Sequence, residues 1–525
     1  MAIASVPVDI EIPSEPTAGM VGGRPALFQS DHGTAGFDAI QAATGHALPG
    51  RFVDADKHMV DDAACRAAAA FPDFASASDA RRGELLCGIA KVLRDNRQIV
   101  LDRCEQETGY ESPRVAGEFE RAAGQLELFA ELAHRRAWDH GNHDPAQPDR
   151  HPLPRPSMRR RMVPVGPVAV FGACNFPLAI SVLGNDLVAA FASGNPVIVK
   201  SHPGHVGTCE LLGRIVAEAV RRSAFSPDIF SILHGLDHDT SRHLVSNDAI
   251  AAVGFTGSPG GGKAIAKVAL ERQRPIPVYA ELGSPNPVFV TDAAMGRRGD
   301  AIADGFVQSL RFGNGHMCTK PGVLIMSRAA ADSLSDRLLP RLNRWEPLPM
   351  LSHRIAADFD EATERLGKLS GIASLSDGDR DDVSPNGPLH RSPKVFLCGW
   401  DDATRHGLLH NETFGPMSLL IALDSSTDVS DAASHFHGSL TSTLHHEPDD
   451  ASQANRWLVV AERFAGRIIS NGWPTGMEIG WATQHGGPFP ASLDGRSTSV
   501  GFHSMSRFVR PVCFQGFDES PIGTQ

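Results

Sequence analysis

Short apolar runs alternate with segments of helical hydrophobic spacing through the middle of this chain. The runs lie at residues 163–173, 196–200, 230–233 and 251–255, and a segment with apolar residues three or four positions apart follows each one. Strands that alternate with helices in this way predict a parallel sheet with both faces covered. Ligands of such sheets gather at the carboxyl ends of the strands.

The flanks of this region show other patterns. After a leader without clear periodicity, residues 78–94 and 118–133 carry apolar side chains at helical spacing, so we expect a helical beginning. Residues 137–156 are rich in Pro, His and Asp, which predicts a connection between lobes or an excursion from the main domain.

A second α/β block begins near Leu282. We expect strands at 288–290 and 322–326, with a helix over 300–310 between them. The polar segment 374–388 is typical of a surface loop. The tail 500–514 mixes aromatic, apolar and basic residues and could supply a strand to a neighbouring lobe or subunit.

Composition narrows the functional classes. With 525 residues and 42% apolar content, the chain should divide into two or three domains. Its net charge of −12, with no basic stripe, argues against a nucleic-acid partner and favours a small solute. We expect a cytoplasmic protein, because the N-terminus does not have the pattern of a secretory signal and no apolar run is long enough to span a membrane. The eight scattered cysteines show no CxxC spacing, which argues against disulfides and structural zinc.

Cys318 is the leading candidate nucleophile. It ends a glycine-rich stretch, 312–322, whose small and polar residues could present a thiol, and Glu281 lies upstream as a separate candidate base. Asn175 follows the run 163–173, at a turn where its amide and a backbone N–H could hold an oxyanion. A single free cysteine is more often a core residue, so Cys318 needs support from its neighbours.

The segment 257–263, Gly-Ser-Pro-Gly-Gly-Gly-Lys, comes close to a phosphate-binding P-loop. Ala264 stands where that motif needs a hydroxyl to hold magnesium, which disfavours the alternative of a P-loop nucleotide hydrolase. A glycine-rich turn from strand to helix still offers backbone N–H groups to a dinucleotide pyrophosphate. Lys200 ends an apolar strand, where its ammonium could reach a ribose hydroxyl.

These segments occur in an order that resembles the aldehyde dehydrogenase superfamily, over nearly the whole chain after the leader. The shared motifs are Asn175-Phe-Pro177, Lys200, Phe255-Thr-Gly257-Ser258 with Gly262, Glu281-Leu-Gly283, Gly313 to Cys318, and Glu412-Thr-Phe414-Gly-Pro416. The resemblance implies a Rossmann-type cofactor domain over 20–138 and 163–280, and an α/β catalytic domain over 281–482. It also implies a small β oligomerisation element from 139–162 with 498–516, in a homodimer or homotetramer.

The resemblance implies catalytic roles for three residues. Cys318 would be the nucleophile, Glu281 the base that activates the deacylating water, and Asn175 would form the oxyanion hole with the Cys318 amide. The aldehyde would pass through a thiohemiacetal and a thioester, with hydride transferred to the nicotinamide and no metal required.

Cofactor contacts follow in the same way. Lys200 would hold the adenosine ribose and Glu412 the nicotinamide ribose, while Phe414 would pack by the nicotinamide. Ser258, in the turn with Gly257 and Gly262, would lie near the pyrophosphate. NAD-preferring relatives carry a Glu three positions after the strand-ending Lys. This chain has Pro203 there, which favours NADP, with NAD as the alternative.

The motifs are most similar to those of a subgroup that oxidises 2-oxoglutarate semialdehyde. The most distinctive stretch is 484–491, Gln-His-Gly-Gly-Pro-Phe-Pro-Ala, with Thr-Ser-Val-Gly at 498–501. A related branch acts on long-chain aliphatic aldehydes, which is the alternative substrate class, and a catalytically inactive relative is a further alternative. Candidates for binding the substrate carboxylate are Arg159, Arg160, Arg161 and Arg311.

Overall fold

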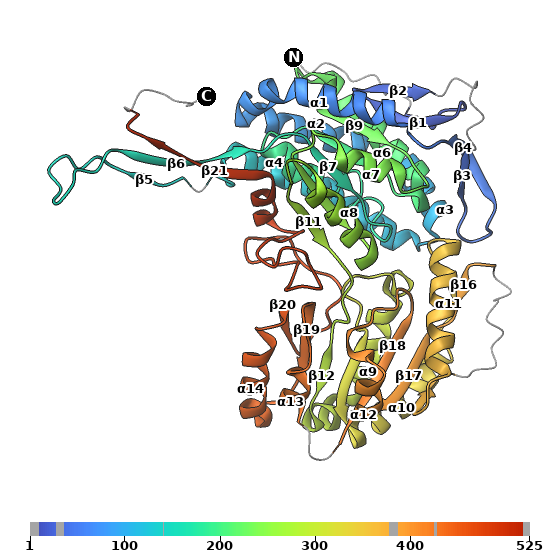
Figure 1. Cartoon of the computed structure of the whole chain (residues 1–525). Helices are drawn as coiled ribbons and strands as arrows, with labels where there is room; N and C mark the ends of the chain where they lie inside the picture. Colours follow the sequence, from blue (N-terminus) through green and yellow to red (C-terminus); the bar gives the residue numbers. More distant parts are fainter. Residues whose placement is uncertain (1–9, 28–35, 140, 377–386, 425–427, 518–525) are drawn as a thin grey trace.

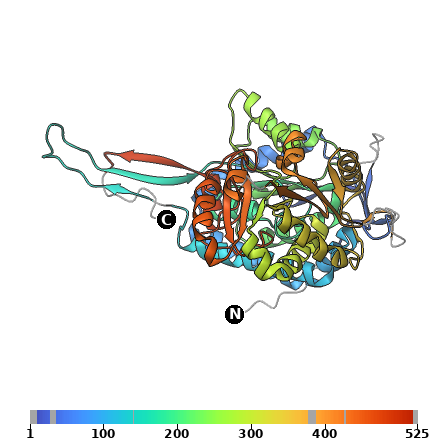
Figure 2. The ribbon, with the colours of Figure 1, turned by 90° about the horizontal axis from the view of Figure 1, so that it is seen from below.

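The computed structural model describes residues 10–27, 36–139, 141–376, 387–424 and 428–517. Two large sheets lie one above the other in Figure 1, each covered by helices, and a narrow β arm projects from the upper one. Seen from below in Figure 2, the arm stands clear of the body. The fold is therefore the α/β architecture expected from the alternating pattern.

The first sheet has nine strands in the order β11-β10-β7-β8-β9-β1-β4-β3, with β2 paired to β1. Its parallel centre runs from β11 to β9, as the apolar runs predict. The strand bounds are β1 Thr17–Val21, β2 Arg24–Leu27, β3 Phe37–Ile40, β4 Ala47–Phe52, β7 Val168–Phe171, β8 Val197–Lys200, β9 Phe230–Leu233, β10 Ala252–Thr256 and β11 Val278–Glu281.

Helices cover both faces of this sheet. Val197 and Val199 of β8 enter the core formed with α2, α4, α5 and α6, whereas Ile198 enters the core formed with α1, α7 and α8. Successive strand residues point to opposite faces, so a strand buried on both sides is apolar throughout. The helix bounds are α1 Lys57–Ser76, α2 Asp79–Asp95, α3 Arg97–Thr108, α4 Ser112–His134, α5 Asn185–Ala192, α6 Val206–Arg222, α7 Asp239–Ser246 and α8 Pro259–Glu271.

The second sheet has seven strands in the order β15-β17-β18-β13-β12-β19-β20. All its pairings are parallel except that of β15 with β17. Its strands are β12 Val288–Val290, β13 Val323–Ser327, β15 Ile372–Ser374, β17 Lys394–Gly399, β18 Met417–Leu423, β19 Ser439–His445 and β20 Ala465–Ser470.

One core joins this second sheet to α9 and α10, and another joins it to α11 through α14. A short separate ladder pairs β14 Leu348–Pro349 with β16 His390–Arg391. The helices are α9 Asp292–Arg311, α10 Arg328–Leu342, α11 His353–Gly367, α12 Trp400–Arg405, α13 Val429–Ala433 and α14 Ala451–Ala461.

The arm is a three-stranded antiparallel sheet in the order β21-β6-β5. Its strands are β5 His143–Asp144, β6 Met158–Pro164 and β21 Val509–Gln515. The tail strand expected from the sequence therefore exists, and it pairs with the segment 158–164 of the same chain. None of the helices in the described ranges is long and apolar enough to cross a bilayer.

The helices expected over 78–94 and 118–133 are present as α2 and α4, but the chain does not begin with helices. Strands β1 to β4 precede α1, and β1 pairs with the first sheet through β9. These strands are short, and β4 alternates exposed and half-buried residues and contains Pro and Gly, so hydrophobic periodicity did not reveal them. Part of the expected loop 374–388 lies outside the described residues.

Candidate active site

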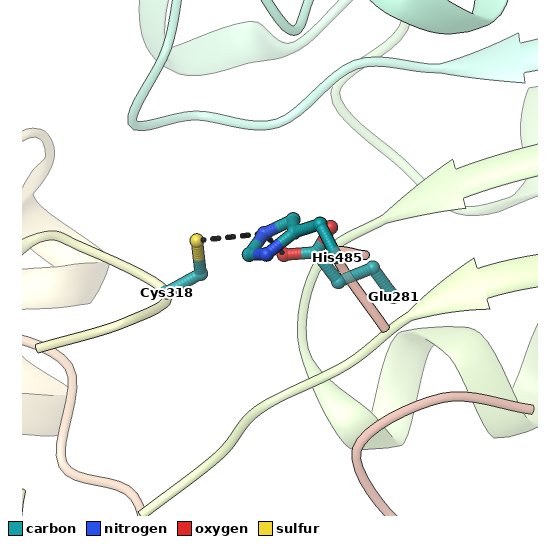
Figure 3. Close-up of side chains that lie close together, drawn as sticks. All are labelled: Glu281, Cys318 and His485. Atoms are coloured by element: carbon teal, nitrogen blue, oxygen red, sulfur yellow. Dashed lines mark hydrogen bonds and ion pairs between the residues drawn. The ribbon is translucent and has the colours of Figure 1, made fainter. Parts of the chain in front are cut away.

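A thiol, an imidazole and a carboxylate lie close together in one cluster (Figure 3). The Cys318 Sγ lies 3.4 Å from the His485 Nε2, and the same nitrogen lies 2.8 Å from the Glu281 Oε1. His485 and Glu281 are within ion-pair distance, but they are not aligned as a hydrogen bond, and the Glu281 Oε1 has no hydrogen-bond partner. His485 and Glu281 are buried, while Cys318 is half-buried.

Three parts of the fold bring these groups together. Glu281 is the last residue of β11, at the carboxyl end of a parallel strand. The segment that carries His485 folds back onto that strand end, where the Leu282 N–H donates to the Ala491 carbonyl at 2.8 Å. Cys318 follows the turn Phe312–Gly315 at the end of α9. The site therefore depends on contacts between distant parts of the chain.

Electrostatics keep the Glu281 carboxylate ionised. Burial raises its pKa, but His485, the Ser499 hydroxyl and Cys318 together outweigh that effect, and the net pKa is lowered. Ser499 donates to the Glu281 Oε2 and also to the His485 carbonyl, the latter at 3.1 Å. Ser499 thereby holds the carboxylate beside the imidazole.

The thiol itself is disfavoured as an anion. Burial, the Glu281 carboxylate and the Glu412 carboxylate raise the pKa of Cys318 well above its ordinary value. Ionisation of Cys318 then requires a proton acceptor that leaves a positive charge beside the sulfur. The nearby His485 imidazole is such an acceptor.

Asn175 lies where the sequence placed it, beside the nucleophile loop. Its amide nitrogen donates to the His316 carbonyl at 2.7 Å, two residues before Cys318. The backbone carbonyl of Asn175 accepts a hydrogen bond from Arg114 at 2.8 Å. Arg114 also forms a buried ion pair with Glu118 of the same helix, α4. Asn175 is thus held between α4 and the nucleophile loop.

The nucleophile loop is anchored from within. Asn286 donates to the carbonyls of Cys318 and Lys320 at 2.8 and 2.9 Å. The buried Lys320 ammonium donates to the carbonyls of Thr413 and Met417, so it ties this loop to the segment that carries Glu412. Burial lowers the pKa of His316 to about 3, and its Nδ1 lies 2.8 Å from the Gly313 carbonyl. His316 is therefore a structural residue of the loop.

The glycine-rich turn opens helix α8. Ser258 caps this helix, accepting from the Gly261 N–H at 3.2 Å. Gly262 packs so closely that a Cβ would collide with Leu282, while the space around Gly260 in the first turn is open. Gly257 donates to the Glu281 carbonyl at 3.1 Å. An exposed helix N-terminus next to the candidate base fits a pyrophosphate.

The remaining predicted cofactor residues lie at the edges of the same region. Lys200 ends β8, is buried and donates to the Gly235 carbonyl; burial lowers its pKa to about 8. The Glu412 carboxylate packs against Gly283, where a Cβ would collide with it, and burial raises its pKa to about 7. Phe414 packs on His316, with ring centroids 5.1 Å apart.

Sequence reasoning missed two residues of the central cluster. His485 was noticed only as part of a distinctive motif, and Ser499 lies in the neighbouring motif 498–501. The signal available was a polar residue beside a Gly-Gly pair far from the nucleophile. Spacing alone does not connect positions 167 residues apart.

The structure places the sequence-based candidates for binding a substrate carboxylate outside the Cys318–His485–Glu281 cluster. Arg159, Arg160 and Arg161 lie on β6 of the arm, paired with β21. Arg311, at the end of α9, is exposed and lies 3.2 Å from Glu111. The run of arginines belongs to an arm strand, which sequence periodicity did not separate from the neighbouring β7.

Comparison with known proteins agrees with this geometry. A family model described as the aldehyde dehydrogenase family matches residues 28–507. The chain belongs to this family and is an NAD(P)-dependent aldehyde dehydrogenase.

Two curated relatives are considerably more similar than the fold requires. An alpha-ketoglutaric semialdehyde dehydrogenase 2 of Azospirillum brasilense is 41% identical over 462 residues, 87% of each chain. An alpha-ketoglutaric semialdehyde dehydrogenase of Acinetobacter baylyi is 37% identical over 468 residues, 88% of each chain. Among solved structures, a Thermus 1-pyrroline-5-carboxylate dehydrogenase with bound NAD has a TM-score of 0.79 at 20% identity, and covers 96% of this chain and 93% of its own.

Proposed function

We propose that this enzyme oxidises 2-oxoglutarate semialdehyde to 2-oxoglutarate, with Cys318 as nucleophile. The observation that carries the chemistry is the contact of the Cys318 sulfur with His485, which is itself beside the Glu281 carboxylate. The names of the two relatives at 41% and 37% identity support the substrate.

Acylation begins with transfer of the Cys318 proton to the His485 Nε2, and Glu281 stabilises the imidazolium that forms. The sulfur then bonds to the aldehyde carbon, and the carbonyl electrons move onto oxygen. Asn175 uses one amide hydrogen to hold the His316 carbonyl, so its second is free, with the Cys318 backbone N–H, to stabilise this oxyanion. A nicotinamide held in this site would supply the acceptor for the hydride that leaves this carbon, and a thioester would then remain on Cys318.

Deacylation needs a water molecule and a base. Glu281 is ionised, since its pKa is lowered, and it accepts a proton as the water oxygen attacks the thioester carbon. The carbon–sulfur bond breaks and the departing thiolate recovers a proton from His485. Glu281 and the acid product each release a proton to solvent, the carboxylate product leaves, and the cluster returns to its starting state.

The cofactor residues support binding of a nicotinamide dinucleotide. Its pyrophosphate would face the first turn of α8, at Ser258 and the adjacent glycines, where open space surrounds Gly260. Lys200 would hold the adenosine ribose from the end of β8, and Glu412 the nicotinamide ribose. These assignments use the carboxyl edge of the first sheet, where both β8 and β11 end.

The choice between NADP and NAD depends on the charge near Lys200. A carboxylate near the adenosine ribose would repel the 2′-phosphate of NADP. Pro203 supplies none, which favours NADP. Asp54 and Asp237, however, lie close enough to Lys200 to act on its pKa, which favours NAD. We keep NADP as the prediction. Initial rates with each cofactor at equal, subsaturating concentration test it, and a higher kcat/KM with NAD would contradict it.

The arm supports a homodimer or a homotetramer built from dimers. Its outer strand β21 has β6 on one side and an unpaired edge on the other within the described chain. An unpaired strand edge is a template for a second chain. Light scattering of the purified protein should give a mass of two or four copies, and a monomer would contradict the proposal.

Substrate assays test the main proposal directly. NAD(P)H formation should be most efficient, by kcat/KM, with 2-oxoglutarate semialdehyde, lower with glutaraldehyde, and lowest with decanal. A preference for decanal would instead support the long-chain aldehyde alternative. No activity with any of the three would reject the proposed function.

A further inference from the structure

Two arginines lie near the nucleophile without an ion-pair partner among the described residues. Arg121 is on α4 and Arg467 is on β20, and the described ranges place no carboxylate within ion-pair distance of either. Both are half-buried, and the Arg467 Nε is a buried donor with no acceptor. Desolvated guanidinium groups are costly unless an anion pairs with them.

Both side chains converge on one loop. Arg121 donates to the Met477 carbonyl at 3.3 Å, and Arg467 donates to the carbonyls of Gly476, at 2.8 Å, and Pro474. The loop is attached to α9, because Thr475 contacts the Ser309 hydroxyl and carbonyl. The two arginines therefore reach the same short segment from different lobes.

The position of this pair relative to Cys318 follows from its neighbours. Arg121 is one helical turn beyond Glu118, whose carboxylate accepts the backbone N–H groups that follow the Asn175 turn. Gly466, next to Arg467, packs on the Gly486 carbonyl so closely that a Cβ would collide with it, and Gly486 follows His485. One arginine thus adjoins the oxyanion side of the site and the other adjoins the imidazole side.

The charges agree with this placement. Burial lowers the pKa of both guanidinium groups, and in each case the Cys318 sulfur acts in the opposite direction. On Arg121 the Glu118 carboxylate acts in that direction more strongly than the sulfur does. Glu478, which also acts on Arg121, is exposed and lies beyond ion-pair distance of that guanidinium in the described part of the chain.

We propose that Arg121 and Arg467 form the subsite that binds the distal carboxylate of the aldehyde substrate. This inference rests on the proposed function, and it assigns the recognition of an anionic 2-oxo acid to two named residues. In 2-oxoglutarate semialdehyde the carboxylate carbon is four bonds, roughly 5 Å, from the aldehyde carbon, which is a short enough span for one end to meet Cys318 and the other an arginine. Guanidinium groups bind carboxylates through paired, charge-assisted hydrogen bonds.

The test compares two aldehydes of five carbons, one anionic and one neutral. For Arg121→Met and for Arg467→Met, the ratio of kcat/KM for 2-oxoglutarate semialdehyde to that for pentanal should fall by about 10- to 100-fold. The matched control is Arg311→Met, which removes an exposed arginine at the end of α9 that pairs with Glu111. It should leave the ratio unchanged.

Folding and function are separated by two further measurements. Arg121→Lys and Arg467→Lys keep the charge, so each should recover part of the lost ratio if the charge is what matters. Inhibition of pentanal oxidation by 2-oxoglutarate should be present in the wild type and weakened in both Met variants. A Met variant that keeps the wild-type ratio and the wild-type inhibition would overturn the proposal.

Failure of the substrate assignment gives a different result. If the wild type does not prefer 2-oxoglutarate semialdehyde over pentanal, the proposed substrate is rejected. If glutarate or butyrate then still inhibits the wild type and not the Met variants, the subsite stands for another carboxylated aldehyde. If the preference is present but survives both substitutions, the subsite is rejected and the function stands.

Discussion

Removal of the His485 imidazole should strongly reduce the rate at which Cys318 reacts. A thiol with a pKa of 9 is about 3% ionised at pH 7.5, and burial with the nearby carboxylates raises the pKa of Cys318 well above its ordinary 9.0. The thiolate fraction at rest is therefore below about 3%, so the reaction depends on a base that takes the thiol proton as the sulfur attacks. Loss of a positioned base costs about 10²- to 10⁴-fold, or roughly 3 to 5 kcal/mol of transition-state stabilisation.

Two assays measure this effect in His485→Ala. The first is kcat/KM for aldehyde oxidation, which should fall within the range given above. The second is the rate of alkylation by iodoacetamide at pH 7.5 without cofactor, which should also fall because His485 no longer accepts the thiol proton as the sulfur reacts. His353→Ala, which removes an exposed imidazole at the start of α11, is the control and should change neither rate.

The result that refutes this reasoning is specific. If His485→Ala is alkylated as fast as the wild type and keeps its kcat/KM, Glu281 acts on the thiol without the imidazole. Glu281 raises the pKa of Cys318, so a fast thiolate in that variant would also show that the cofactor-free site differs in charge from the structure. If alkylation is slow but turnover is normal, proton transfer to His485 does not limit the rate of turnover.

Three other predictions concern the same region. Glu281→Gln should release NAD(P)H in a burst of one equivalent per site and then turn over slowly, because the water that attacks the thioester lacks its base. Stopped-flow absorbance measures the burst, and steady turnover at the wild-type rate would contradict this prediction. The pKa of Lys200 is lowered to about 8, so its charge is lost as the pH rises through 8, and the cofactor KM should rise above that pH. Lys200→Arg stays charged and should keep a flat KM between pH 7 and 9, whereas a rise like that of the wild type would assign the effect elsewhere. Zn²⁺ should inhibit competitively with the aldehyde and reversibly with EDTA, since Glu281, Cys318 and His485 offer three ligand atoms within 4.8 Å of one another; sensitivity retained in His485→Ala would contradict that site.

The sequence predicted the architecture where local patterns carry it. The parallel centre of the first sheet was legible because β7, β8, β9 and β10 are short apolar runs, each followed by a helical segment. The four N-terminal strands could not be recognised from the sequence. β4, for example, has only one buried residue and pairs with the edge strand β3. They join the sheet through β1, which pairs with β9, a strand that lies about 200 residues later in the chain, and propensity does not report such a pairing.

The same distinction applies to the site. Cys318, Glu281 and Asn175 were found because each stands in a local motif, and the structure brings Glu281 to the thiol and Asn175 to the loop before it. His485 reaches them only because the segment after β20 folds back onto the end of β11, a contact that spans more than 150 residues of chain. A histidine beside two glycines has no chemical role that spacing can reveal.

The arginines show why charge runs were misleading. Arg159 to Arg161 formed the most conspicuous basic cluster near a motif, yet consecutive strand residues point to opposite faces and cannot converge on one small anion. Arg121 and Arg467 are 346 positions apart in unrelated elements, and they converge because the carbonyls of 474–477 hold both guanidinium groups. A subsite for a single carboxylate therefore arises from isolated arginines on different elements. Folding brings these arginines together, and their spacing in the sequence does not indicate it.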